Sequence, residues 1–229
     1  MNMTNENIGS ISQNVASEMN DGHSRMSSFV SVALALWFGL VFLLGARGAF
    51  GASPGSPPLP IFFGFAIPLV VFFAAYRGWG AFRAFVLGAD LRLLAAMQGW
   101  RWAGLGFLSL YAHGVLPGLF AFPAGLGDVA IGVSAPWIVL GLIRHPAFVT
   151  SRRFVTWNIL GIVDLVLAVS LGTICSGFIP GITGNVTTGA MAQLPLLLIP
   201  AYFVPLFIIL HVTALAQARR LARSGKSVQ

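Results

Sequence analysis

Charged residues are scarce in this sequence. They make up 8 % of its 229 residues, with six Asp or Glu and thirteen Lys or Arg. A water-soluble domain carries roughly a quarter charged residues, because its surface has to face water. Hydrophobic residues account for 57 % of the chain instead. The composition excludes an ordinary soluble fold and predicts an integral membrane protein.

Cysteine and lysine are each present only once. Cys175 has no partner cysteine, so neither a disulfide framework nor a thiolate metal cluster can form within one chain. Lys226 lies next to the C-terminus, which leaves no lysine for a phosphate-binding loop or for a Schiff base inside the membrane. The net charge of +7 comes from bases that flank apolar segments. We therefore expect contacts with lipid head groups and no nucleic-acid site.

Long apolar segments define the architecture. A helix needs about 20 residues to cross the hydrocarbon core of a bilayer. We predict an all-α, polytopic bundle over residues 28–217, between a flexible polar N-terminal tail (1–27) and a basic C-terminal tail (218–229). Its six transmembrane helices are expected at 29–48, 59–76, 103–122, 123–143, 155–175 and 193–215.

The distribution of Arg and Lys predicts the orientation. With six spans, twelve of the thirteen bases lie on one side and only Arg47 lies on the other. Because basic residues stay on the cytoplasmic side, both termini are expected there, in a cell membrane and most simply the bacterial inner membrane. Partners are then the bilayer and anionic head groups, while the oligomeric state stays open.

The segment 80–100 has apolar residues at helical spacing but also contains Arg83, Asp90 and Arg92. Charges in hydrocarbon are costly. We therefore expect an amphipathic helix that lies on the cytoplasmic surface of the membrane and does not cross it.

Four ionisable residues fall well inside the expected spans: His113, Asp128, Asp164 and His211. Such groups usually face a bundle interior or a wet cavity. Small residues share a helical face with three of them, as expected where transmembrane helices approach closely. The inward faces are predicted as Gly106, Ser109, His113 and Pro117; Gly125, Asp128, Gly132 and Ala135; and Asn158, Gly161, Asp164, Ala168 and Gly172.

Asp128 and Asp164 also occupy equivalent places in a short internal likeness, in which Gly, Asp, Val and Ser recur at identical spacing around 125–134 and 161–170. The two helices run in opposite directions, so an inverted repeat of the transporter type is one explanation. Chance similarity of Gly- and Val-rich helices is the other.

These residues lead to one main functional hypothesis. The protein binds or moves a small solute or a proton through an internal site, in which His113 and Asp164 form a proton-carrying or ligand-contacting pair. Asp128 guards the outer entrance, and Asn158, Tyr111 and His211 are supporting polar groups, with His211 nearer the cytoplasm and beside Asn158. No catalytic residue is proposed, and a non-enzymatic role is favoured.

Two alternatives stay open. In the first, His113 and His211 supply axial nitrogens to a haem b or ligands to a metal, which makes the protein a redox protein or an enzyme; otherwise no cofactor is predicted. In the second, each polar group is satisfied separately, and the chain is a non-catalytic subunit of a membrane complex.

Overall fold

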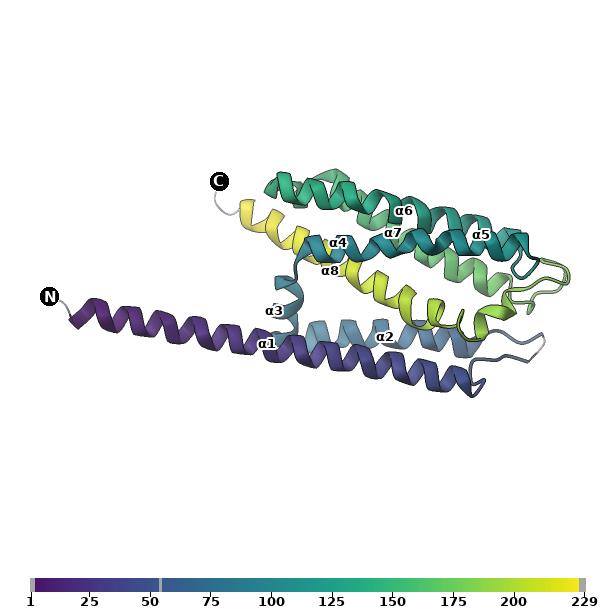
Figure 1. Ribbon diagram of the computed structural model, residues 1–229, viewed down its shortest axis with the longest axis horizontal. Coiled ribbons are helices and arrows are strands. Elements are labelled where there is room, and N and C mark those ends of the chain that lie inside the picture. Colours follow the sequence, from purple (N-terminus) through teal and green to yellow (C-terminus); the bar gives the residue numbers. More distant parts are fainter. Residues whose placement is uncertain (1–2, 54, 227–229) are drawn as a thin grey trace.

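The computed structural model describes residues 3–53 and 55–226, and every regular element in this part of the chain is a helix (Figure 1). The first helix, α1, runs over Met3–Ala46. Helix therefore begins where the sequence led us to expect a tail without regular structure. A turn with Gly48 at positive φ and a Pro-rich loop follow. Helix α2 covers Leu59–Gly78, close to the expected 59–76.

The segment after α2 differs from the prediction. Helix α3 is short, Gly80–Gly88, and stands across the bundle (Figure 1). After a break at Ala89 the chain turns into α4, Leu91–Met97, then a 3-10 segment η1, Gln98–Gly104, and α5, Leu105–Ala112. These three elements form one rod of residues 91–112 along the bundle (Figure 1). The single helix expected over 80–100 is thus two helices with different directions.

Local chemistry explains this break. Asp90 has an extended backbone, and its carboxylate accepts a hydrogen bond from the backbone N of Arg92 at 2.8 Å. It is an N-cap, which satisfies a donor that the first helical turn leaves unpaired. We had interpreted Asp90 as a charge that keeps 80–100 out of the membrane, whereas the structure gives it the role of starting α4.

The chain reverses earlier than predicted, at residues 113–117 and not at Phe122-Pro123. Gly114 has a φ of 69°, and the N–H groups of Val115 and Leu116 bond to the carbonyl of Leu110. Helix α6 then runs over Gly118–Arg144 straight through Pro123. The expected span 103–122 is therefore replaced by the end of the 91–112 rod, the turn and the first residues of α6.

The remaining elements agree better with the prediction. After a 3-10 turn η2, Pro146–Thr150, helix α7 covers Arg152–Ile174 and is capped by the hydroxyl of Ser151. A long connection holds the 3-10 turn η3, Thr188–Ala192. Next come a π-helical turn η4, Ile199–Phe203, and helix α8, Val204–Lys226, which continues into the segment expected as a basic tail.

Helix α8 lies between two groups of helices. It contacts α2 and α3 on one side and α4 and α7 on the other, and α6 packs on α4, η1, α5 and α7 (Figure 1). One end of the bundle holds the ends of α2, α6 and α8 and the starts of α4 and α7 (Figure 1). Most of the arginines lie in or next to these helix ends in the sequence. The long loops lie at the other end, which we call the loop end.

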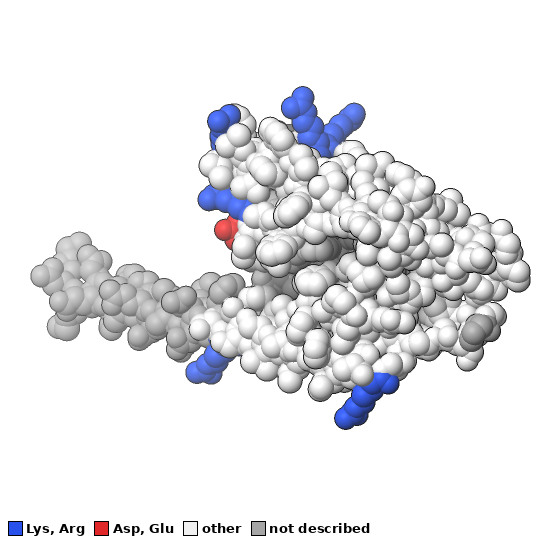
Figure 2. Space-filling model, turned by 45° about the vertical axis from the view of Figure 1, so that its right-hand side comes forward, with Lys and Arg blue, Asp and Glu red and all other residues white. Residues whose placement is uncertain are grey.

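Five of the described helical segments are long and apolar enough to cross a membrane: Ser24–Ala46, Leu59–Gly78, Gly118–Arg144, Arg152–Ile174 and Ile199–Ser224. Their outward surfaces carry many exposed large apolar side chains. Figure 2 shows wide areas of one face without a charged residue. These features are consistent with a multi-pass membrane protein whose apolar surface faces lipid.

Candidate functional site

The centre of the bundle holds an arginine, one of the twelve bases that the charge distribution predicts on the cytoplasmic side. Arg101, in η1, is only 2 % exposed. Its Nε donates to Oδ1 of Asp128 in α6 at 2.7 Å, and its Nη2 donates to Oδ2 of Asp164 in α7. One guanidinium thus joins three elements, which uses the fork of donors that distinguishes Arg from Lys.

His211 of α8 completes this arrangement. Its Nε2 lies 3.2 Å from Nη1 of Arg101, and its Nδ1 lies 2.9 Å from Oδ1 of Asn158. Since a guanidinium can only donate, Nε2 accepts and Nδ1 carries the proton to Asn158. The hydrogen-bond pattern therefore assigns a neutral ring with one defined tautomer. Asn158 is fixed in turn, because its Nδ2 donates to the carbonyl of Phe154 at 2.8 Å.

We call these five residues the Arg101 cluster: Arg101, Asp128, Asp164, Asn158 and His211. Trp157 flanks it, with its ring edge-on to the His211 ring at 5.3 Å and its Nε1 donating to the hydroxyl of Ser134 at 2.8 Å. Arg101 also points Nη1 at the carbonyl of Gly161, 3.4 Å away. The polar groups therefore hold one another in place across η1, α6, α7 and α8.

Glycines allow the helices to come this close. A Cβ atom on Gly161 would overlap the ring of His211, and one on Gly127 would overlap the carboxylate of Asp164. At the contact of η1 with α6, a Cβ on Gly104 would lie 2.8 Å from the carbonyl oxygen of Gly125.

The prediction that small-residue faces of α6 and α7 point inward is confirmed, since Gly125, Gly132 and Gly161 are buried.

The charges in the cluster do not balance. With His211 neutral, it contains one guanidinium and two carboxylates, which leaves one excess negative charge when both aspartates are ionised. An unpaired charge is expensive in a medium of low dielectric constant. Binding a proton or another cation to one carboxylate removes this excess.

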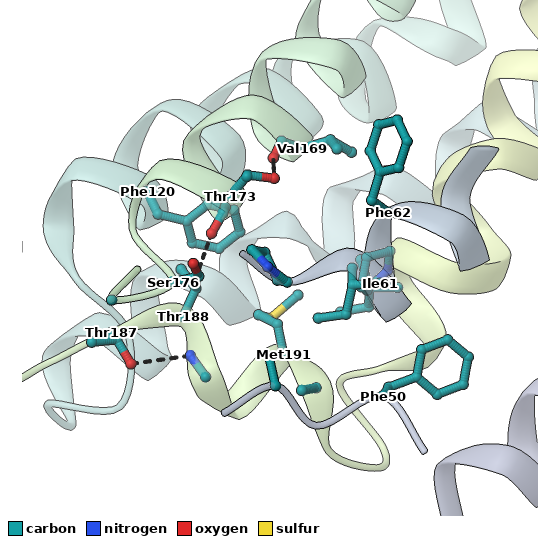
Figure 3. A pocket seen from close by; sticks show the side chains of 18 of the residues that line it. Phe50, Ile61, Phe62, Phe120, Val169, Thr173, Ser176, Thr187, Thr188 and Met191 are labelled. Carbon is teal, nitrogen blue, oxygen red and sulfur yellow. Dashed lines mark hydrogen bonds between the residues drawn. The ribbon is translucent and has the colours of Figure 1, made fainter. Parts of the chain in front are cut away.

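A cavity of about 620 Å³ connects the cluster to the loop end of the bundle. Asp128 is the member of the cluster that lines it. Figure 3 shows this cavity from close by, with Phe50, Ile61 and Phe62 across from the hydroxyl-bearing Ser176 and Thr188. Its size is that of a pocket for a small organic molecule. The cavity thus extends to the immediate surroundings of the ion pairs.

The structure brings together four of the six residues proposed from the sequence: Asp128, Asp164, His211 and Asn158. The expected neighbourhood of His211 and Asn158 is present as a direct hydrogen bond. Asp128, expected at the outer entrance, is a direct partner of Arg101 at the inner part of the cavity.

His113 and Tyr111 are not brought to the cluster. Both are exposed, and Nδ1 of His113 lies 2.8 Å from the carbonyl of Ser109 in its own helix. At 1.5 Å per residue, His113 lies roughly 18 Å along the 91–112 rod from Arg101. The predicted inward face of Gly106, Ser109, His113 and Pro117 is therefore wrong for the first three, which are exposed, while Pro117 is buried in the turn before α6. The inward face consists of Gln98, Arg101, Gly104 and Phe107, all buried.

The proposed pairing of His113 with His211 is not present either. His211 is buried and both its ring nitrogens have partners, whereas His113 is exposed near the loop end. Among the described residues, no group of three or more His, Cys, Asp or Glu has the arrangement of a metal site.

Arg101 was not predicted as a site residue, because the hydropathy pattern places the start of the expected span at residue 103, after this arginine. Two features of the sequence could have identified it. The two aspartates inside expected spans need a cation as a partner. Arg101 also lies three residues from both Gln98 and Gly104, so the three share one helical face that can turn inward. In the internal likeness, Asp128 and Asp164 both bind this one guanidinium, from two antiparallel helices.

Comparison with protein families places this chain. It belongs to the family described as Domain of unknown function (DUF8737), whose model matches residues 58–219 and hence most of the chain. The matched region begins at α2 and includes the whole Arg101 cluster. Neither the curated proteins nor the solved structures contain a match.

Proposed function

We propose that this chain is a membrane protein that binds a small solute in the cavity at its loop end and couples this binding to a proton on the Arg101 cluster. The observation that carries the proposal is the position of Asp128, which lines the cavity and at the same time binds Arg101. A ligand that engages Asp128 shares this carboxylate with the guanidinium and weakens its attraction for Arg101. Arg101 then shifts toward Asp164 and His211, so ligand binding in the cavity changes the contacts of η1 with α7 and α8.

The excess carboxylate supplies the chemistry of coupling. A proton on Asp164 cancels the excess negative charge and weakens the ion pair of Asp164 with Arg101. The contact between η1 and α7 is then less stable. Loss of that proton restores both ion pairs. Two arrangements of the bundle, with one or two carboxylates ionised, are the minimum that proton-linked binding or transport requires.

In this proposal the 91–112 rod is a sixth crossing. At 1.5 Å per residue it is about 33 Å long, enough for a hydrocarbon core of about 30 Å. Arg101 lies near its middle, where two carboxylates offset the cost of the charge. Six crossings place both termini and most of the arginines on one side, which is the cytoplasmic side by the distribution of bases. The cavity then opens to the outside of a cell membrane.

The test uses the purified full chain. In proteoliposomes with a pH-sensitive dye inside, an imposed potassium diffusion potential should drive proton entry faster than in protein-free liposomes. Asp164→Asn should abolish this difference, while Asp90→Asn, which removes an exposed carboxylate far from the cavity, should not. In parallel, a library of small metabolites is screened for a rise in melting temperature. No stabilising ligand together with no protein-dependent proton entry contradicts the proposal.

A further inference from the structure

The cavity has a wall chemistry that selects for one charge. Asp128 is the only ionisable side chain among the described residues that line it. Its Oδ1 is bound by Arg101, and no hydrogen bond from a described residue reaches its Oδ2. A free carboxylate oxygen of a cluster with excess negative charge is thus left for a ligand.

Two threonine hydroxyl groups of the wall can act only as acceptors toward a ligand. The hydroxyl of Thr173 donates to the carbonyl of Val169 at 2.9 Å, and that of Thr188 donates to the carbonyl of Gly172 at 2.6 Å (Figure 3). With these protons committed, each oxygen offers a ligand only its lone pairs. Ser176 Oγ is buried without a partner and can serve either way. The wall therefore suits a ligand that brings its own N–H donors.

The rest of the cavity is apolar and aromatic. Phe50, Phe62, Phe107 and Phe120 line it, and the last two meet edge-on at 5.3 Å. The faces of aromatic rings attract cations, and rings also bury apolar groups well. A bare metal ion would need several oxygen ligands around it, whereas most of this wall is carbon. Size and lining favour an organic body that carries a single positive group.

We infer that the cavity takes a small organic cation, with its apolar body against the phenylalanines and its ammonium group on Asp128. This rests on the proposed function and names the class of solute. An anion is repelled by the Asp128 carboxylate, and a neutral molecule of the same shape gains nothing from the excess negative charge. The bound cation neutralises the cluster just as a proton does, so solute and proton exclude each other at this site.

Three probes of nearly equal shape test the charge: naphthylmethylamine, which is a cation at neutral pH, naphthylmethanol and naphthoate. Saturable binding to the purified full chain is measured by equilibrium dialysis, relative to protein-free micelles. The cation should bind about tenfold or more tightly than either other probe, as expected for one added charge-assisted contact. In Asp128→Asn this preference should disappear, and in Asp90→Asn it should persist.

A second variant covers the case in which Asp128→Asn does not fold. Gly172 lines the cavity, and a Cβ atom there meets Phe120 at an ordinary 3.5 Å. Gly172→Leu places four carbon atoms in the cavity, away from the cluster, so it should weaken binding of the cation by reducing the space for its apolar body.

Naphthoate or naphthylmethanol binding as tightly as the amine overturns the inference but leaves a solute site. Absence of saturable amine binding, or amine binding unchanged in Gly172→Leu, also overturns it. The proposed function fails separately, only if the metabolite screen and the proton assay are both negative.

Discussion

Arg101 and Asp128 face each other across the contact of η1 with α6, with 2.7 Å between Nε and Oδ1, at a place where the backbones approach closely through Gly104 and Gly125. The same guanidinium binds Asp164 and His211, so one side chain joins the four helical elements around the middle of the bundle. Its removal leaves two partly buried carboxylates without a cation. Several measurable consequences follow from this dependence.

The first prediction concerns Arg101 itself. Arg101→Gln should lower the free energy of unfolding by about 3–5 kcal/mol, because removing one partner leaves an uncompensated buried charge. Arg101→Lys should recover only part of the loss, since an ammonium lacks the planar fork. Arg92→Gln, at an exposed arginine of the same rod, should change the free energy of unfolding by less than about 0.5 kcal/mol. Unfolding by heat or denaturant in detergent measures the difference, and equal losses in the Arg101 and Arg92 variants would contradict the cluster.

A compensated variant separates charge from shape. In Arg101→Gln combined with Asp128→Asn and Asp164→Asn, no charge remains unpaired, so the combined variant should be more stable than Arg101→Gln alone by about 1–3 kcal/mol. The same measurements on the two single Asp→Asn variants complete the set. Additive losses in the combined variant would mean that the three side chains contribute independently.

Much of this bundle is predictable from hydropathy. The spans at 59–76 and 155–175 agree with α2 and α7 because apolar runs bounded by loop residues fix them. The inward faces of α6 and α7 follow from helical spacing, because small residues on the same face as an aspartate allow a neighbouring helix to pack closely there. Asp128 and Asp164 were therefore found.

The helix expected over 103–122 was misplaced for a physical reason. A hydropathy scale assigns Arg101 the full free energy of moving an unpaired guanidinium into hydrocarbon. In the folded bundle, two carboxylates and an imidazole lower that free energy. These partners lie 27, 63 and 110 residues away in the sequence. A local pattern cannot register them. The expected helix, 103–122, therefore lies about three helical turns further along the chain than the observed rod, 91–112, and it brought His113 into the site in place of Arg101.

Close packing at Gly161 gives a prediction about shape alone. Gly161→Ala places a methyl group against the His211 ring, which is held on both sides and cannot move away. Overpacking of this kind costs about 1–3 kcal/mol. Gly106→Ala is the matched control, since nothing lies within 4 Å of the new Cβ, and it should be neutral or stabilise the helix by up to about 1 kcal/mol. Thermal unfolding of both variants is the measurement, and a Gly161→Ala protein as stable as Gly106→Ala would show that the ring does not pack on this glycine.

The last prediction tests the path of the chain through the bilayer. Single cysteines are placed at the two ends of the 91–112 rod, as Arg92→Cys and His113→Cys, in a Cys175→Ala background that removes the buried native thiol. Both positions are exposed. If the rod crosses, a membrane-impermeant maleimide labels only His113→Cys in intact cells and labels Arg92→Cys only after permeabilisation.

Two further positions calibrate the sides. Ser53→Cys lies in the loop between α1 and α2 and should behave as His113→Cys does, while Arg220→Cys lies near the end of α8 and should behave as Arg92→Cys does. The test is strict because, of the proposed crossings, the rod alone carries a basic residue near its middle. Labelling of Arg92→Cys and His113→Cys from the same side would mean that 91–112 does not cross, and the two termini would then have to lie on opposite sides of the membrane.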